Sequence, residues 1–311
     1  MHPYFQAIVA AYAAADRPFF HQVTPAVARD MMRAAQNAAP QPLDLPALAS
    51  VTDEQVDGPN GHIGIRRYLP TGDVAGTCVF CHAGGWVLGD LDTADNLCRR
   101  LAGLAGVEVI SVDYRLAPEY AFPAPLDDVH AVLCWADTLQ RPLVVAGESA
   151  GANLVAACAI QVRDEGGPHI VGQFLAYPVT DHNFETEAYQ SIGTRNWLLS
   201  RADMQWFWDQ YCPPSVDRSN SLVSPLNLVT AAGLPQALLL VAELDPLRDE
   251  GLAYAALLEA HGVPVIVKEG RGMLHGYLNA AGAIPEVAAA VAEAAGWMRA
   301  CIVNSSGDSR I

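Results

Sequence analysis

The sequence predicts an α/β fold built on a mostly parallel sheet that carries a helical cap. Three observations support this prediction. Apolar runs of strand length alternate with helical patterns along most of the chain, a G-x-S-x-G turn joins one strand to the next helix, and two segments stand outside the alternation. Strands that alternate with helices form βαβ units, whose strands run parallel in one sheet.

The first fifty residues, 1–50, are predicted to be helical and to form the first part of the cap. Apolar residues recur at helical spacing over 4–15. Thr24-Pro25 is a helix start ahead of the second pattern, 27–38, because proline is favoured at the first helical position. Three prolines then end the helical pattern: Pro40, Pro42 and Pro46.

The alternating pattern supplies the α/β core in two parts, 51–180 and 226–303. The predicted strands are 50–57, 63–69, 76–81, 107–113, 143–146, 171–177, 237–242 and 263–268. The predicted helices are 95–105, 126–138, 150–163, 248–260 and 285–300. No helix separates the first two strands, so the sheet is expected to open with an antiparallel hairpin.

The segment 181–225 interrupts the alternation and is rich in aromatic residues over 189–211. These aromatics either pack into the core as an extra helix or line an apolar binding site under a cap. Both alternatives stay open for any single residue, and the segment as a whole is expected to line a pocket. The candidate wall residues are Trp86, Trp197, Phe207 and Tyr211. The polar end, 304–311, is expected to be a flexible tail.

The composition excludes several classes of protein. Lys and Arg number 18 against 34 Asp and Glu, a formal net charge of −16, and 51% of the residues are hydrophobic. Nucleic acid and anionic membrane surfaces need clustered basic residues, and no basic run is present. No stretch approaches the length of a membrane-spanning helix. We therefore expect a globular protein with neither partner, and a homodimer stays open.

The seven cysteines are odd in number and scattered, which favours reduced thiols in the cytoplasm over a disulfide framework. Nine apolar residues, 7–15, lack the preceding positive charge of a signal peptide. Asp90, Asp92 and Asp95 lack the glycine and the final glutamate of a calcium loop, because Leu101 stands at the twelfth position. The sequence thus predicts a cytoplasmic protein without metal or cofactor.

The sharpest chemical signal is Gly147-Glu148-Ser149-Ala150-Gly151, which follows the strand 143–146 and opens a helix. A strained turn in this context lifts a serine hydroxyl above the sheet edge. A Cβ on either glycine would collide where strand and helix nearly touch. Ser149 is therefore the predicted nucleophile.

A serine hydroxyl needs a base, and the base needs a carboxylate that orients it. With this turn the chain order is serine, acid, histidine. Of His169, His182, His261 and His275, only His275 follows the carboxyl end of a predicted strand, where parallel sheets assemble their sites. Asp245, in the loop before the helix 248–260, is the predicted acid. Glu243 and Asp249 are expected to pin that loop by capping or ion pairing.

Donors for an oxyanion complete the predicted site. His82-Ala83-Gly84-Gly85-Trp86 follows the strand 76–81 and supplies glycine amides that a substrate can approach. Together with the amide of Ala150, those of Gly84 and Gly85 are expected to form the oxyanion hole.

These motifs resemble those of the hormone-sensitive-lipase-like branch of the α/β-hydrolases, the bacterial family IV esterases. Besides the two motifs above, the matching stretches are Asp113-Tyr114-Arg115-Leu116-Ala117-Pro118-Glu119, Phe122-Pro123-Ala124-Pro125, Asp245-Pro246-Leu247-Arg248-Asp249 and His275-Gly276. The resemblance implies a triad of Ser149, Asp245 and His275, the oxyanion hole named above, and an N-terminal cap completed by an insert after the sixth strand. The sequence departs from the family at two positions: Ala83 replaces the first glycine of H-G-G-G, and Glu148 stands where Asp or Thr is usual.

The sequence therefore predicts a carboxylesterase that acts through an acyl-enzyme on a neutral small-molecule ester, with a short to medium acyl chain or a small aryl group. An amidase or formamidase could use the same triad. A non-catalytic receptor of the same fold, as the plant gibberellin receptors are, would lack the histidine that His275 supplies. A dehydratase or lyase that reuses the pocket is the last alternative.

Overall fold

A computed structural model describes residues 1–38, 44–195 and 197–307. Within them, one sheet of eight strands has the order β1-β2-β4-β3-β5-β6-β7-β8. The strands are β1 (Leu48–Gly58), β2 (Gly61–Pro70), β3 (Thr77–Cys81), β4 (Glu108–Asp113), β5 (Leu143–Glu148), β6 (Ile170–Ala176), β7 (Ala237–Leu244) and β8 (Val265–Leu274).

The strand directions confirm the predicted sheet. β1 pairs antiparallel with β2, and β2 antiparallel with β4. From β4 to β8 all neighbouring strands are parallel. The central strands β3 and β5 are buried along their whole length, because helices cover both faces, and this explains why they read as continuous apolar runs.

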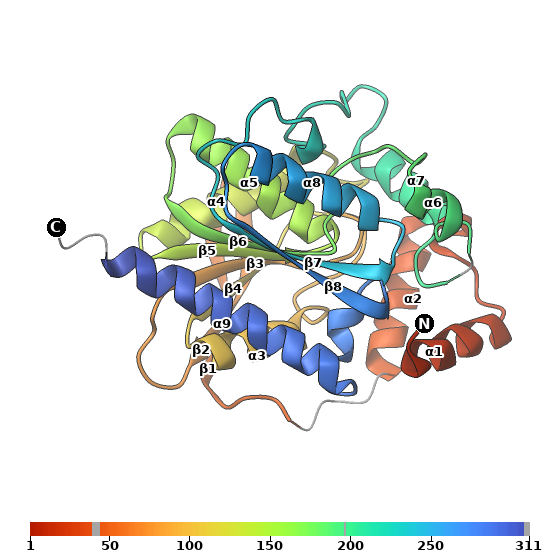
Figure 1. Ribbon diagram of the computed structural model, residues 1–311, viewed down its shortest axis with the longest axis horizontal. Helices are drawn as coiled ribbons and strands as arrows, with labels where there is room; N and C mark the ends of the chain where they lie inside the picture. The colour runs from red at the N-terminus through yellow and green to blue at the C-terminus, as the bar shows by residue number, and fades with distance from the viewer. Residues whose placement is uncertain (39–43, 196, 308–311) are drawn as a thin grey trace.

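Helices form a layer on each face of the sheet (Figure 1). One face carries α4 (Ala124–Asp137), α5 (Ala150–Glu165) and α8 (Arg248–Ala260), and the other carries α3 (Asp95–Ala105) and α9 (Pro285–Gly307). Each layer encloses its own hydrophobic cluster. The expected start of the tail at Asn304 is wrong, because α9 continues to Gly307; residues 308–311 lie outside the described part of the chain.

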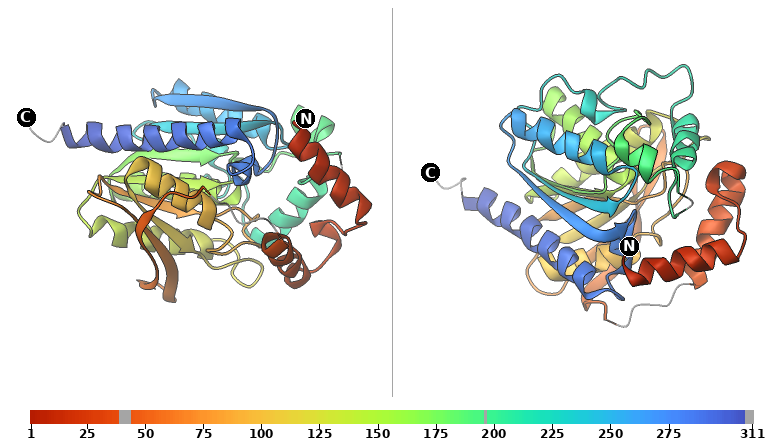
Figure 2. Two further views of the ribbon diagram at one scale, coloured as in Figure 1. Left: turned by 90° about the horizontal axis from the view of Figure 1, so that it is seen from below. Right: turned by 45° about the vertical axis from the view of Figure 1, so that its right-hand side comes forward.

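Helices from both segments outside the alternation gather beyond the carboxyl ends of the parallel strands (Figures 1 and 2). They are α1 (Pro3–Ala14), η1 (Phe20–Gln22), α2 (Pro25–Ala38), α6 (Glu187–Ser191) and α7 (Arg201–Tyr211). Pro40 and Pro42, expected to break the helical pattern, lie outside the described residues. These helices are called the cap below.

A buried carboxylate joins the two halves of the cap. Asp203 is 1% exposed, and its Oδ1 accepts from the backbone N–H of His21 at 3.1 Å and lies 2.8 Å from His21 Nδ1. The other oxygen, Oδ2, accepts from the N–H and the hydroxyl of Ser200, in a capping box at the start of α7. One side chain thus fixes both the helix start and the N-terminal segment.

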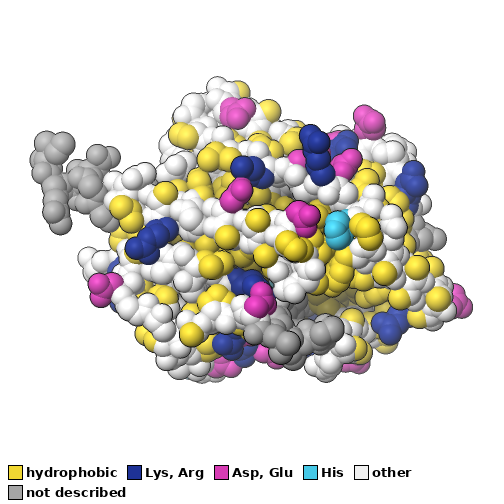
Figure 3. Space-filling model, turned by 60° about the horizontal axis from the view of Figure 1, so that its bottom comes forward, with side chains coloured by type: hydrophobic (Ala, Val, Ile, Leu, Met, Phe, Trp, Pro, Cys, Tyr) yellow, Lys and Arg dark blue, Asp and Glu magenta, His cyan; other side chains and the backbone are white. Residues whose placement is uncertain are grey.

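Three further observations concern the surface, the cysteines and the length of the apolar helices. On the face shown in Figure 3, basic side chains are scattered, and several of them lie beside acidic ones. All seven cysteines are free thiols, and six of them are buried. Over the described residues, no helix combines the length and the apolar character needed to cross a bilayer.

Asp203→Ala is expected to destabilise the cap by about 1–3 kcal/mol, the cost of leaving buried donors without an acceptor. Denaturant unfolding and the rate of proteolysis within residues 1–38 measure the effect. Asp209→Ala is the matched control on the same helix, because Asp209 is exposed and pairs with Arg218 at the surface. Equal stability of the two variants would contradict this role of Asp203.

Candidate active site

Ser149 occupies a strained turn between β5 and α5. Its backbone has φ 55° and ψ −120°, a left-handed conformation that costs energy for a residue with a side chain. A Cβ on Gly147 would lie 2.5 Å from the carbonyl carbon of Gly151, and one on Gly151 would lie 2.1 Å from the Cys81 carbonyl oxygen. Both glycines are therefore required by close backbone contacts, as the sequence predicts.

The structure brings Ser149, His275 and Asp245 into one hydrogen-bonded line. Ser149 Oγ lies 2.9 Å from His275 Nε2, and His275 Nδ1 lies 2.7 Å from Asp245 Oδ2. Asp245 is 1% exposed, and its Oδ1 accepts from the N–H of Leu247 at 2.9 Å. The three residues follow β5, β8 and β7 at their carboxyl ends, so the strand order of the sheet places them side by side.

The other candidate acids and bases have structural partners. Glu243 accepts a hydrogen bond from the N–H of Gly272, and Asp249 accepts one from the N–H of Ala188. Glu243 therefore links β7 to β8, and Asp249 links α8 to α6. His182 Nδ1 lies 3.2 Å from the hydroxyl of Ser224, and His261 Nδ1 lies 2.9 Å from the carbonyl oxygen of Leu257 at the end of α8.

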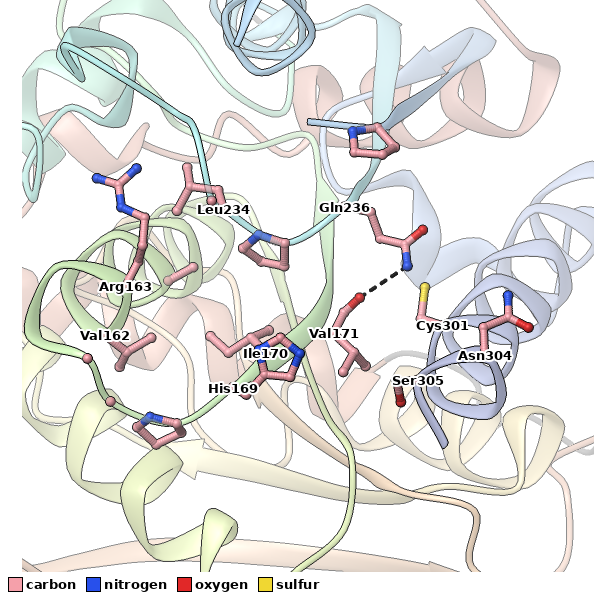
Figure 4. A pocket seen from close by; sticks show the side chains of 17 residues that line it. Val162, Arg163, His169, Ile170, Val171, Leu234, Gln236, Cys301, Asn304 and Ser305 are labelled. Carbon is pink, nitrogen blue, oxygen red and sulfur yellow. Dashed lines mark hydrogen bonds between the residues drawn. The ribbon is translucent and has the colours of Figure 1, made fainter. Parts of the chain in front are cut away.

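His169 lies at the opposite edge of the sheet. It lines a cavity of about 570 Å³ at the amino ends of β6, β7 and β8, together with Arg163, Gln236 and Cys301 (Figure 4). In that cavity Gln236 donates a hydrogen bond to the Val171 carbonyl. Because Ser149, Asp245 and His275 lie at the carboxyl ends of the strands, this cavity is not part of their site.

The loop after β3 lies beside the turn that carries Ser149. Gly84 and Gly85 have positive φ angles of 135° and 58°, and a Cβ on Gly84 would lie 2.1 Å from the Leu88 carbonyl oxygen. Ala83 is not among the residues with positive φ, so its methyl group fits the loop without backbone strain. The Ala150 amide opens α5, where N–H groups have no partner within the helix.

His82 anchors this loop from below. Its ring stacks on Tyr114 with centroids 4.2 Å apart, and its Nδ1 lies 2.8 Å from the Ala83 carbonyl oxygen. Burial lowers the pKa of His82 to about 4, because the protein interior disfavours the charged imidazolium. A neutral, buried imidazole suits a structural role.

The four candidate wall residues have different positions. Phe207 covers the glycine loop, since a Cβ on Gly85 would lie 2.2 Å from its ring. Trp86 and Tyr211 are completely buried and stack with centroids 4.3 Å apart, so their rings pack against one another inside the protein. Trp197 lines a cavity of about 270 Å³ between the two halves of the cap.

Two phenylalanine rings lie between this cap cavity and the glycine loop. Phe20 lines the cavity, and its ring lies 5.8 Å from that of Phe207. The lining includes the cation of Arg17 and the carboxylates of Asp16 and Asp203. The cap cavity therefore offers no excess of positive charge to an anionic ligand.

The chain was compared with known proteins. A family model described as the alpha/beta hydrolase fold matches residues 78–279. Carboxylic ester hydrolase LipN of Mycobacterium tuberculosis is 42% identical over 265 residues, 81% of this chain and 69% of that protein. Ethyl acetate hydrolase of Pseudomonas putida is 36% identical over 251 residues, 76% of this chain and 78% of that protein. The crystal structure of a thermostable esterase from Pseudomonas putida superimposes with a TM-score of 0.91 at 32% identity, covering 97% of each chain.

The chain belongs to the hormone-sensitive-lipase-like esterases of the α/β-hydrolase superfamily. The predicted fold and family are thereby confirmed. In this α/β-hydrolase, sequence reasoning missed two residues near the site, Phe20 and Tyr177. Tyr177 directly follows the carboxyl end of β6, a position that could have marked it. Phe20 carries no comparable signal, because only the folded cap brings it to Phe207.

Gly151→Ala is expected to destabilise this hydrolase by about 1–3 kcal/mol, as overpacking does, because the Cys81 carbonyl leaves no room for a methyl group. Thermal and denaturant unfolding measure the loss. The matched control is Gly296→Ala, another helical glycine, whose Cβ would meet nothing within 4 Å. The Gly296→Ala variant should gain roughly 0.5–1 kcal/mol of stability. A Gly151→Ala variant as stable as the wild type would contradict the packing argument.

Proposed function

We propose that this protein is a carboxylesterase that hydrolyses neutral esters of short to medium acyl chains or of small aryl groups. The line from Ser149 Oγ to His275 Nε2 and from His275 Nδ1 to Asp245 carries the proposal. Nucleophile, base and orienting acid in this order are the requirements of acyl transfer to serine.

In the acylation step, Ser149 Oγ attacks the ester carbonyl carbon while His275 Nε2 accepts the serine proton. The tetrahedral intermediate collapses, His275 gives that proton to the departing alkoxide, and the alcohol leaves an acyl-enzyme. Water then attacks the acyl carbon, with His275 accepting its proton, and the acid departs as the proton returns to Ser149. Asp245 orients the imidazole and stabilises its charged form.

The negative charge that develops on the carbonyl oxygen needs donors on the other side of the substrate. We assign this role to the amides of Gly84, Gly85 and Ala150. Ala150 also opens α5, so the positive end of the helix dipole faces the same point.

The substrate range follows from the walls of the site. Phe207 limits the space above the glycine loop, and Phe20 and Trp197 continue an apolar surface into the cap. The lining of the cap cavity includes one cation, Arg17, and two carboxylates, Asp16 and Asp203, which favours neutral over anionic esters. The Pseudomonas putida relative is named ethyl acetate hydrolase, which agrees with a small substrate.

The cellular location, the choice between esterase and amidase, and the oligomeric state are finer parts of the same proposal. The seven free thiols favour the cytoplasm, where disulfides are rare. Parallel assays of p-nitrophenyl acetate and p-nitroacetanilide distinguish an esterase from an amidase on the same triad. A homodimer stays open, and sizing by light scattering tests it.

Ser149→Ala is expected to lower the rate on p-nitrophenyl acetate and butyrate by on the order of 10⁴-fold or more, since the nucleophile is lost. Ser219→Ala, a change at an exposed loop serine, is the matched control and should keep full activity. The wild-type rate should also fall on acidification, because a protonated His275 cannot accept the serine proton. Full activity of Ser149→Ala would overturn the mechanism.

Phe207→Leu is expected to shift the substrate preference toward longer acyl chains, because the shorter side chain opens space above Gly85. The measurement is the ratio of kcat/KM for p-nitrophenyl octanoate to that for the butyrate, which is independent of enzyme concentration. A ratio unchanged from wild type, in a variant that unfolds normally, would remove Phe207 from the pocket wall.

A further inference from the structure

A buried carboxyl group stands next to Ser149, and the mechanism above does not use it. Glu148 is the last residue of β5 and is 2% exposed. Its Oε1 accepts a hydrogen bond from the hydroxyl of Tyr177. Tyr177 follows Ala176, which pairs with Glu148 in the sheet register, so the two side chains meet at the carboxyl ends of β5 and β6.

Tyr177 also contacts His275. The two rings meet edge to face, with centroids 4.9 Å apart and planes inclined by 64°. This geometry is the favoured one for aromatic pairs. The phenol therefore joins Glu148 at its hydroxyl and His275 at its ring.

The backbone around Tyr177 is fixed by the same strands. The N–H of Tyr177 donates to the Leu240 carbonyl at 2.6 Å, and the N–H of Ser149 donates to the Ala176 carbonyl at 2.9 Å. Tyr177 has φ 38° and Ser149 has φ 55°. Strained residues that persist in a rigid surrounding cluster at functional sites, and here both of them contact the imidazole of His275.

The charge of Glu148 depends on pH in the range where esterases work. Burial raises the pKa of Glu148 to about 7, while the Tyr177 hydrogen bond and the charge of His275 act to lower it. This electrostatic coupling is mutual, so an ionised Glu148 favours the imidazolium of His275.

Four other titratable residues of the described chain face Glu148, Tyr177 or His275. Cys98 of α3 and Tyr114 after β4 interact with Glu148, and burial raises the pKa of both far above the ordinary values. They therefore carry no charge near neutral pH. Asp245 faces His275 at Nδ1. Tyr277 lies against the ring of Tyr177.

We propose that Glu148 and Tyr177 form a positioning pair for His275, in which the tyrosine ring fixes the imidazole plane and the carboxylate supplies a second negative charge to the imidazolium. This inference rests on the proposed esterase function and deepens it. Both residues act through His275 and neither contacts the substrate. The pair also gives a role to Glu148, which stands where Asp or Thr is usual in the family. The glutamate side chain is longer than either and reaches the Tyr177 hydroxyl.

Glu148→Gln tests the charge, because it keeps the length and the acceptor of the side chain. The plateau of kcat is expected to fall, and the acid limb of the kcat/KM profile is expected to move to lower pH by on the order of one unit, the shift that a neighbouring charge produces. KM should stay near the wild-type value. A wild-type pH profile in a folded Glu148→Gln variant overturns the proposal.

Tyr177→Phe tests the link between the two groups. It keeps the ring on His275 and removes the donor that lowers the pKa of Glu148, so the carboxyl stays neutral to higher pH. Near neutral pH its profile should approach that of Glu148→Gln, and the double variant should show no additional shift of the acid limb. Additive shifts contradict a common path through Tyr177.

The matched control is Tyr68→Phe, which removes another buried tyrosine hydroxyl that donates to a carboxylate, Asp95. It should leave the acid limb in place even if it lowers stability. Glu148→Asp keeps a charge, so the midpoint of its acid limb should lie between those of the wild type and Glu148→Gln. A shift in Tyr68→Phe equal to that in Tyr177→Phe overturns the assignment.

A second measurement separates this inference from the function on which it rests. In a Ser149→Ala background, the titration of the His275 imidazole is followed by NMR with and without Glu148→Gln, and no hydrolysis is needed. A titration moved to lower pH by Glu148→Gln supports the pair, and an unmoved one overturns it. Absence of ester hydrolysis by the wild type would instead overturn the proposed function.

Discussion

The close approach of β5, α5 and β3 is the constraint on which the site depends. Gly147 faces the backbone of Gly151, and Gly151 faces the carbonyl of Cys81, at distances that admit no side chain. Because the backbones touch, Ser149 is forced into the left-handed region with its hydroxyl raised above the sheet edge. Strands β3, β7 and β8 end beside that hydroxyl and place the glycine loop, Asp245 and His275 relative to it.

The loops that carry Asp245 and His275 are held by backbone hydrogen bonds and by the cap. Leu247 donates to Asp245, and Gly272, three residues before His275, donates to Glu243. The carbonyl of the same Gly272 accepts from the N–H of His2 at 2.8 Å. The first residues of the cap thus brace the loop of the histidine, while Asp203 ties the N-terminal segment to α7. These hydrogen bonds hold the cap against the loop that carries His275.

Much of this arrangement can be predicted from the sequence, because it follows from local patterns and strand order. The helices 95–105 and 248–260 have the predicted bounds, since apolar periodicity and flanking loops define them. His275 could be selected among four histidines because only it follows the carboxyl end of a strand. Parallel strands share that edge, so sequence order was enough to place it near Ser149.

The features that escaped prediction depend on contacts between distant parts of the chain. His21 and Asp203 are 182 residues apart, and no local pattern links them. The end of α9 is polar in sequence, yet Met298, Cys301 and Ile302 are buried, and this packing extends the helix past Asn304. The sequence marks Glu148 only as a departure from a motif, because its partner Tyr177 follows another strand, β6.

The surroundings of His275 explain why two carboxyl groups beside one imidazole can have different tasks. Asp245 meets the ring directly at Nδ1 and is held by a backbone amide, so its position is set before any substrate binds. Glu148 reaches the imidazole only through Tyr177 and the intervening space. A direct hydrogen bond selects the tautomer, which a charge at a distance cannot do. The negative charge of Glu148 can still stabilise the imidazolium of His275 without competing for its proton. The pKa of the Glu148 carboxyl is about 7. Glu148 therefore acquires its charge near the pH at which His275 must be neutral to act as a base.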